Sequence, residues 1–347
     1  MAATACETFG DPHSSLPSVA KMSVPENTAI DVETTGAGGA PLRGTLVLPP
    51  ARPAPAVLLV QGSGPTDRNG NQPPALITDL LRQLAETLAG FGIASLRYDK
   101  RGMHANAASL PAEAAARRDF VRFEHFVDDA AAMLAQVRAR PEVDATRVGL
   151  FGHSEGGLIG LVLAARGGAG APATLVLAAT PGRPFAAVLR DQLERLGRAQ
   201  GAGDAVLGPL LDENDRILAH VEATGDYPPV ISPGLRALYQ PYLRAFLRSL
   251  ARLRPVDLAA RVEVPVLVIN GTADLQVSPD RDALALGMAL ASRRLGPNVY
   301  SVSLLNAVGH NLKTVAGPGD AGFGGPVAEA VTQALHGWFS GLGWISA

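Results

Sequence analysis

Cysteine is almost absent from this sequence, since Cys6 is the only one among 347 residues. An internal disulfide bond is therefore impossible. Cys6 lies in a polar N-terminal segment outside any core pattern, which excludes a thiol nucleophile or a thiolate metal site. Long apolar runs are missing too, because nowhere do eighteen apolar residues follow one another, and the first twenty residues lack the pattern of a signal peptide. We therefore expect a cytoplasmic protein that does not enter a membrane.

An excess of charge of either sign is also missing. The chain has 30 basic and 32 acidic residues and a formal net charge of -2, which gives no field to attract nucleic acid. No cluster of His, Cys or carboxylate residues has ligand spacing, so we expect neither a metal nor an organic cofactor. Hydrophobic residues make up 47% of the chain, a content typical of a globular enzyme that acts on a small molecule. The sequence is compatible with a homodimer but does not define the oligomeric state.

The chain length predicts one main domain with a sizeable insertion, because 347 residues exceed the size at which a single core stops growing. Residues 1–25 are rich in Ser, Pro, Ala and Thr without periodicity and are interpreted as a tail or arm. We assign residues 26–182 and 262–347 to the core. Residues 183–261 are assigned to an inserted helical cap, because the strand rhythm stops there and amphipathic helical patterns replace it.

Short apolar runs alternate with helical stretches through most of the core. Such runs are typical of strands that are buried on both faces of a parallel sheet, and they occur at 56–60, 93–98, 148–151, 175–178 and 264–269. Leucines at helical spacing predict helices within 77–88 and 126–137. Residues 29–35 and 42–48 flank a Gly-Ala-Gly-Gly stretch and predict an antiparallel hairpin. Together these patterns predict a doubly wound, mostly parallel α/β sheet, with ligands at the carboxyl ends of its strands.

The stretch Gly152-His153-Ser154-Glu155-Gly156-Gly157 follows the apolar run 147–151 directly and precedes a potential helix. Small residues permit a turn so sharp that the Ser154 hydroxyl stands at its apex, open to a substrate. The Gly-x-Ser-x-Gly pattern alone is only a hypothesis. Its position between a strand and a helix favours Ser154 as a nucleophile.

A nucleophilic serine needs a base and an acid that holds this base. The strand at 264–269 leads into Asn-Gly-Thr-Ala-Asp, which ends at Asp274, and the apolar run 299–305 leads into the loop with His310. We expect these two residues to complete a triad with Ser154, in the chain order that nucleophile-elbow hydrolases use. Asp280 and Asp282 lie a few residues further along, and Asp274 is favoured over them.

The oxyanion that forms on attack needs backbone donors. We expect one from Glu155, just after the nucleophile, and a second from Ser63, in the glycine-containing loop 61–71. The alternative is that this loop is an ordinary turn, because Asn69-Gly70 is a strong turn signal. That interpretation explains only the C-terminal part of the loop.

The other histidines and the charged clusters have plainer interpretations. His153 is expected to pack within the sharp turn at Ser154, the nucleophile elbow. The others are expected in the tail, in a loop, on helices or in the cap: His13, His104, His125, His336 and His220. Asp99, Lys100 and Arg101 are interpreted as a salt-bridged group that braces the sheet edge. Arg244, Arg248 and Arg252 share one helical face, for which a solvated surface is favoured over recognition of a substrate carboxylate.

These motifs, in this order, resemble the α/β hydrolases. They are Gly62-Ser63-Gly64-Pro65-Thr66-Asp67-Arg68-Asn69-Gly70-Asn71, Arg97-Tyr98-Asp99-Lys100-Arg101-Gly102, Gly152-His153-Ser154-Glu155-Gly156-Gly157, Gly271-Thr272-Ala273-Asp274 and Gly309-His310. Within this superfamily the chain is similar to the carboxylesterase branch, close to the EstD-like serine esterases and serine aminopeptidase-like hydrolases. The resemblance spans about residues 29–340. One departure is Gln61, where many α/β hydrolases have a histidine.

The resemblance implies a helical cap and cleavage of esters with small to medium acyl groups through an acyl-enzyme. An aminopeptidase or an acyl thioesterase with the same triad is the alternative among enzymes, because the same chemistry cleaves peptides and thioesters. A ligand-binding protein that has kept the fold without catalysis is the alternative from another class.

Overall fold

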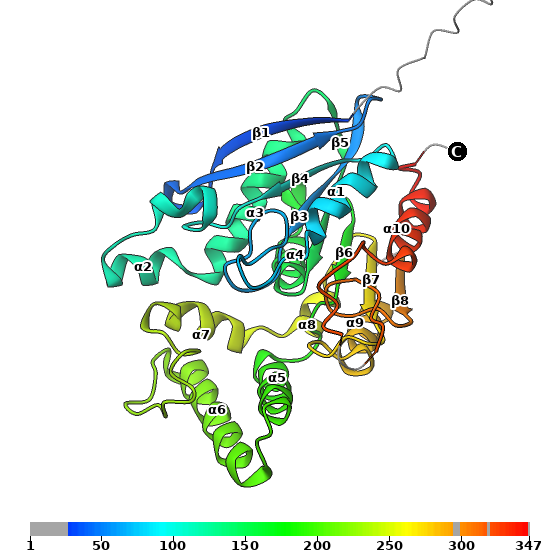
Figure 1. The fold of residues 1–347 in the computed structure, drawn as a ribbon. Coiled ribbons are helices and arrows are strands. Elements are labelled where there is room, and N and C mark those ends of the chain that lie inside the picture. Colours follow the sequence, from blue (N-terminus) through cyan, green and yellow to red (C-terminus); the bar gives the residue numbers. More distant parts are fainter. Residues whose placement is uncertain (1–26, 294–298, 318–319, 346–347) are drawn as a thin grey trace, which may run out of the picture.

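The computed structural model describes residues 27–293, 299–317 and 320–345. Its centre is an eight-stranded sheet with the spatial order β1-β2-β4-β3-β5-β6-β7-β8 (Figure 1). The strands are β1 (Thr28–Thr35), β2 (Pro41–Leu48), β3 (Ala54–Val60), β4 (Ala94–Tyr98), β5 (Val143–His153), β6 (Leu175–Ala178), β7 (Val266–Gly271) and β8 (Tyr300–Leu305). The arm expected at residues 1–25, with Cys6 and His13, lies outside the described residues.

The sheet has one antiparallel side and one parallel side. β1 pairs antiparallel with β2, and β2 pairs antiparallel with β4, whereas every pair from β4 through β3 to β8 is parallel. The predicted N-terminal hairpin and the mostly parallel, doubly wound sheet are thus confirmed. Parallel strands place all their carboxyl ends at one edge, where loops from several strands can meet.

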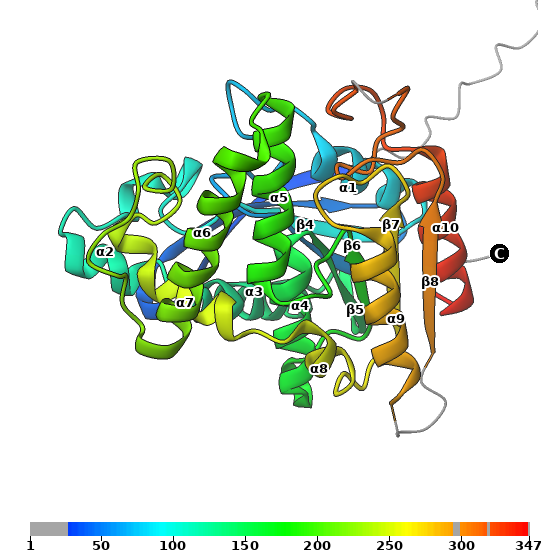
Figure 2. The same ribbon diagram turned by 90° about the horizontal axis from the view of Figure 1, so that it is seen from below.

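Helices cover both faces of the sheet. They are α1 (Leu80–Gly90), α3 (Phe123–Arg138), α4 (Glu155–Arg166), α9 (Leu284–Ala291) and α10 (Glu329–Gly341). A further helix, α2 (Ala114–Phe120), packs instead against the later helix α7 (Arg244–Arg252). One apolar cluster joins the sheet to α3, α4 and α9, and a second joins it to α1 and α10 (Figures 1 and 2). Every residue of β3 is buried, which explains why its sequence is continuously apolar rather than alternating.

Between β6 and β7 the described chain is helical and contains no strand. This segment comprises α5 (Phe185–Ala199), α6 (Asp204–Thr224), α7 (Arg244–Arg252) and α8 (Pro255–Ala259). Its helices α5 to α7 lie outside the carboxyl edge of the sheet (Figure 1). A small apolar cluster of its own holds it together, with Ile217, Val221 and Tyr239 among the buried members. The amphipathic patterns arise because each helix turns one face toward this cluster or the core.

Several elements differ in extent from the sequence-based prediction. β5 begins at Val143 rather than at residue 148, because Val143 still pairs with Ala54 of β3, before the register shifts and Val148 pairs with Ala56. β7 runs to Gly271, two residues past the apolar run. No helix in the described ranges is both long and apolar enough to cross a lipid bilayer.

A buried ion pair connects the antiparallel edge to the helical layer. Arg101, just after β4, donates from Nε and Nη2 to the two carboxylate oxygens of Asp129 on α3, at 2.7 and 2.6 Å. Both side chains are about 1% exposed. Asp129 also accepts the backbone N–H of Ala37, in the turn between β1 and β2. One carboxylate therefore holds three elements in register.

Replacing Asp129 should destabilise the protein strongly. Asp129→Asn leaves the Arg101 guanidinium buried without its counter-charge, so the free energy of unfolding should fall by about 3–5 kcal/mol. Urea unfolding at neutral pH measures this change. The adjacent Asp128→Asn is the matched control, because Asp128 pairs with Arg166 at a side-chain exposure of 45% and should change stability by less than about 1 kcal/mol. Equal effects of the two substitutions would contradict this account.

Candidate active site

Ser154 lies between the last residue of β5 and the first residue of α4. Its backbone has φ 54° and ψ -119°, a conformation that costs a non-glycine residue energy. The Ser154 N–H donates to the Ala178 carbonyl of β6 at 2.8 Å, which holds the strained residue against the sheet. Strand, strained residue and helix follow one another as the sequence predicts for a nucleophile elbow.

The strained turn depends on close backbone approach at Gly156. A Cβ atom there would lie 2.2 Å from the carbonyl oxygen of Val60 at the end of β3. No side chain fits at that distance, so only glycine lets α4 begin directly against β3. The first turn of α4 is thereby pressed toward the loop that follows β3.

His310 and Asp274, from two different loops, meet behind this turn. His310 Nδ1 lies 2.9 Å from Asp274 Oδ2, and both residues are buried. The other oxygen of Asp274 accepts the backbone N–H groups of Gln276 and Val277 at 2.8 and 2.9 Å. Burial raises the pKa of Asp274, but the His310 charge and these hydrogen bonds outweigh it and hold this pKa below its usual value. Asp274 is therefore ionised at neutral pH, and Nδ1 of His310 carries the proton that it donates.

The two rival carboxylates lie elsewhere. Asp282 is fully buried, but it accepts hydrogen bonds from the backbone of Gly182 and Ser278 and pairs with Arg183. Asp280 belongs to the single helical turn Pro279–Ala283. Neither makes the contact with His310 that Asp274 makes.

His153 contacts the His310 loop directly. Its Nε2 lies 2.8 Å from the backbone carbonyl of His310, and the two rings are 4.9 Å apart at their centroids. Since a carbonyl only accepts, Nε2 carries the hydrogen. Burial, with the nearby His310 charge, lowers the pKa of His153 to about 3. The expectation that His153 packs within the elbow was right, and the structure adds a hydrogen bond that holds His310.

The loop after β3 faces Ser154, because Ser63 and Gly62 line the same cavity as Ser154 and His310, a space of about 110 Å³. The backbone N–H groups of Ser63 and Glu155 donate to no acceptor among the described residues. Two backbone donors, one in the cavity wall and one in the residue after Ser154, are thus available to a ligand.

Lys100 ties this loop to the elbow. Its Nζ donates to the carbonyls of Gly62 at 2.6 Å and Gly64 at 3.3 Å, and it pairs with Glu155 at 3.1 Å. The neighbouring Asp99 accepts three hydrogen bonds from Arg68 in the same loop. The charged group therefore braces the sheet edge as expected. Sequence reasoning did not predict the specific ion pair between Lys100 and Glu155. The available signal was that each of these two residues closely follows a predicted strand.

A second space, of about 390 Å³, adjoins the first at His310. Its walls come from α5 and from the loops after β7 and β8, and its apolar residues include Leu196, Leu275 and Phe323. Arg195 of α5 also lines it, and burial lowers the pKa of this guanidinium. The sequence periodicity predicts that Leu196 lies on the apolar face of a helix, but it cannot show which cavity this face lines.

The remaining histidines lie away from this site. His104 was expected in an irregular loop but lies in a short 3-10 helix, where its ring contacts the Pro65 carbonyl at 2.8 Å. The others lie on helices, as expected: His125 on α3, His220 on α6 and His336 on α10. In the described part of the chain no three His, Cys, Asp or Glu side chains converge in a way that could hold a metal ion. Gln61, at the position of a frequent histidine, donates from Nε2 to the Tyr98 carbonyl at 2.8 Å and so links β3 to β4.

Comparison with known proteins agrees with this architecture. Residues 78–202 match the family described as "Serine aminopeptidase, S33". This span contains Ser154 and ends before Asp274 and His310. Esterase EstD of Thermotoga maritima is 29% identical over 240 residues, which are 68% of this chain and 51% of EstD. The chain therefore spans about half the length of this curated relative.

Two solved structures share the fold of this chain. Est1E from Butyrivibrio proteoclasticus matches with a TM-score of 0.53 and 14% identity, over 90% of this chain and 98% of Est1E. The protein described as "Putative hydrolase from Agrobacterium vitis S4" matches with a TM-score of 0.52 and 20% identity, over 92% of this chain and 99% of that chain. At sequence identities of 14% and 20%, the structural likeness establishes the fold alone. The chain has the α/β-hydrolase fold, and the resemblance expected from its motifs is confirmed.

The neutral, buried His153 should make stability depend on pH. Its pKa is about 3 when folded and near 6.5 when unfolded, so below about pH 6.5 the unfolded chain binds the extra proton and stability falls. Between about pH 7.5 and pH 5 this adds a loss of about 2 kcal/mol. His153→Gln can still donate a hydrogen bond but does not titrate, so its urea-unfolding free energy should fall correspondingly less over this range. Parallel pH curves for the two proteins would refute this assignment.

Proposed function

We propose that the protein is a serine hydrolase that cleaves carboxylic esters of small to medium acyl chains through an acyl-enzyme. The observation that carries this proposal is the convergence of Ser154 and His310 on one cavity, with Asp274 hydrogen-bonded to the far nitrogen of the His310 ring. The likeness to EstD supports an ester as the substrate.

In this mechanism His310 is the general base. Its Nδ1–H is held by ionised Asp274, so Nε2 is the free acceptor that takes the Ser154 hydroxyl proton. The serine oxygen attacks the ester carbonyl, and protonated His310 returns the proton to the departing alcohol. Water then attacks the acyl-enzyme with His310 again as base, and the acid leaves.

The negative charge that develops on the carbonyl oxygen needs donors that are fixed in advance. We assign this role to the backbone N–H groups of Ser63 and Glu155. Each such donor is typically worth about a hundredfold to a thousandfold in rate, because it interacts more strongly with the transition state than with the substrate. Lys100 is a positioning residue in this scheme, since it holds both donor segments together.

The larger space beside His310 is proposed to receive the acyl group. Its volume of about 390 Å³ and its apolar walls suit a chain of modest length. Because α5 forms part of the wall, the helical segment 183–261 acts as a cap that defines substrate size.

An aminopeptidase is the second candidate, favoured by the match of residues 78–202 to a serine aminopeptidase family. An acyl thioesterase would use the same triad. Aminoacyl anilides and acyl thioesters, compared with p-nitrophenyl esters at equal concentration, separate these activities. A non-catalytic ligand-binding protein is the remaining alternative, and it would leave Ser154 unreactive toward a fluorophosphonate.

Ser154→Ala should abolish ester cleavage. Loss of the nucleophile typically costs about 10⁴-fold or more in kcat, because triad members act as a unit. The assay is a p-nitrophenyl ester series from acetate to palmitate, for which we expect the highest kcat/KM at short to medium chains. Ser109→Ala is the matched control, since the Ser109 hydroxyl donates to the Asn106 carbonyl away from the cavity. Full activity of Ser154→Ala would exclude the proposed mechanism.

Lys100→Met should lower kcat by about tenfold to a hundredfold with a smaller change in KM. The substitution removes the donor to the Gly62 and Gly64 carbonyls, so the Ser63 N–H loses its fixed position, and one misplaced oxyanion donor costs a rate of this order. Steady-state kinetics measures the split between kcat and KM, and a thermal melt checks that the variant is folded. A folded variant with unchanged kcat would show that Lys100 is structural only.

A further inference from the structure

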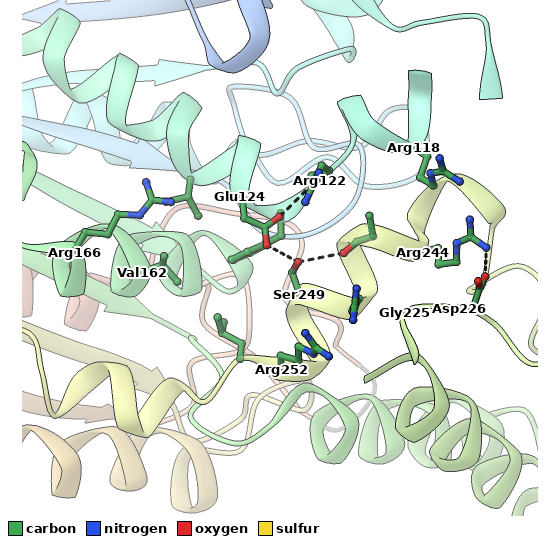
Figure 3. Close-up of a pocket in the computed structure, with 15 residues that line it drawn as sticks. Arg118, Arg122, Glu124, Val162, Arg166, Gly225, Asp226, Arg244, Ser249 and Arg252 are labelled. Atoms are coloured by element: carbon green, nitrogen blue, oxygen red, sulfur yellow. Dashed lines mark hydrogen bonds and ion pairs between the residues drawn. The ribbon is translucent and has the colours of Figure 1, made fainter. Parts of the chain in front are cut away.

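A separate cavity, of about 490 Å³, lies between the inserted helix α7 and the core helices α3 and α4 (Figure 3). Six arginines line it: Arg118, Arg122, Arg166, Arg244, Arg248 and Arg252. Only two carboxylates, those of Glu124 and Asp226, share the lining. Neither Ser154, Asp274 nor His310 belongs to it, so this cavity is distinct from the candidate active site.

The arginines come from both sides of the cavity. Arg166 is on α4, and Arg118 and Arg122 lie on and just after α2, whereas Arg244 and Arg252 belong to α7 (Figure 3). The sequence predicts a solvated face for the α7 arginines. The structure instead turns this face toward the core, where it meets a second set of guanidinium groups.

The two carboxylates do not balance this charge. Asp226 pairs with Arg244. Glu124 accepts a hydrogen bond from the Ser249 hydroxyl and lies 3.9 Å from Arg122. Beyond the lining, Asp128 pairs with Arg166 at 2.6 Å, and Asp119 lies 3.9 Å from Arg118. Among the described residues, no carboxylate lies within ion-pair distance of Arg248 or of Arg252, which donates to the Glu222 carbonyl. The uncompensated positive charge of the lining is therefore that of these two side chains.

Arg248 is the least compensated of the six. Its Nε is buried and has no hydrogen-bond partner among the described residues, and none of their carboxylates lies within ion-pair distance. Its guanidinium lies against Gly225, where a Cβ atom would approach Arg248 Cζ to 2.8 Å. Gly225 has φ +80° at the end of α6, so a glycine is favoured there on both conformational and steric grounds. The close contact holds the Arg248 side chain beside the cavity instead of extended into solvent.

Like charges gathered around one cavity repel each other unless an anion lies between them. Guanidinium groups form paired, charge-assisted hydrogen bonds with planar carboxylates and with phosphates. Phosphate groups place more charge and more acceptor oxygens in a small volume than carboxylates do. A cavity of this size, lined by six guanidinium groups of which two have no carboxylate partner among the described residues, therefore fits a compact ligand with more than one phosphate. Because the chain as a whole has a net charge of -2, this basic region is local.

We propose that this cavity binds a small soluble polyanion whose charged groups are phosphates. Its phosphates contact α7 on one side and the α3 and α4 ends on the other, so the bound ligand ties the inserted helices to the core. A ligand that binds only the folded arrangement stabilises it by mass action. The proposal does not depend on ester hydrolysis at Ser154.

Inorganic pyrophosphate is the probe for this site. Isothermal titration at ionic strength matched with sodium chloride should show saturable binding with one pyrophosphate per chain. Arg248→Gln should weaken binding by about tenfold to a hundredfold, the range typical for loss of one charged hydrogen-bond partner. Arg216→Gln is the matched control, because Arg216 is an exposed arginine of α6 that donates to the Asp212 carbonyl and does not line the cavity. It should bind like the unmodified protein.

A thermal melt with and without pyrophosphate gives a second readout. The ligand should raise the midpoint of the unmodified protein and of Arg216→Gln, and should raise that of Arg248→Gln much less. The melts without ligand show whether each variant is folded. Equal affinity in the two variants, absence of saturable binding, or citrate bound as tightly as pyrophosphate would overturn the proposal. Binding to phosphatidate vesicles but not to pyrophosphate would also overturn it, because the site would then recognise a surface.

Discussion

The strained backbone of Ser154 is the constraint on which the rest of the candidate active site depends. Its φ of 54° is held by a hydrogen bond to β6 and by the packing of Gly156 against the end of β3. Strain of this kind persists only where the surrounding structure enforces it. Parallel pairing of β5 with both β3 and β6 and the helices on both faces of the sheet supply this rigidity, so the half-buried Ser154 stands at the apex of a rigid turn and not on a flexible loop.

Two ionic contacts extend this rigidity to the loops. Lys100 joins the loop after β3 to the first residue of α4, and Asp99 holds Arg68 further along the same loop. His153 fixes the His310 backbone on the other side. The functional groups are therefore positioned by neighbours that take no part in the proposed chemistry. This arrangement matches the general requirement that reacting groups be held within a fraction of an ångström.

Much of the fold and the Asp274–His310 contact could be predicted, because the signals are local. Continuous apolar runs indicate buried parallel strands, and parallel strands place their following loops at one edge. The orientation of α7 could not be predicted in this way. Its leucines mark one face and its arginines the other, but periodicity does not tell whether the polar face meets solvent or another charged surface. The same limit applies to Lys100, whose partners depend on the three-dimensional neighbourhood of three loops.

The position of β8 has a consequence for synthesis of the protein. β8 pairs only with β7 at the edge of the sheet, and His310 follows it directly. During translation the elbow, its glycines and the loop after β3 can be complete while the histidine is still inside the ribosome. In the proposed mechanism the nascent chain therefore has no general base until residue 310 has emerged, and a product that ends before this residue lacks the proposed activity.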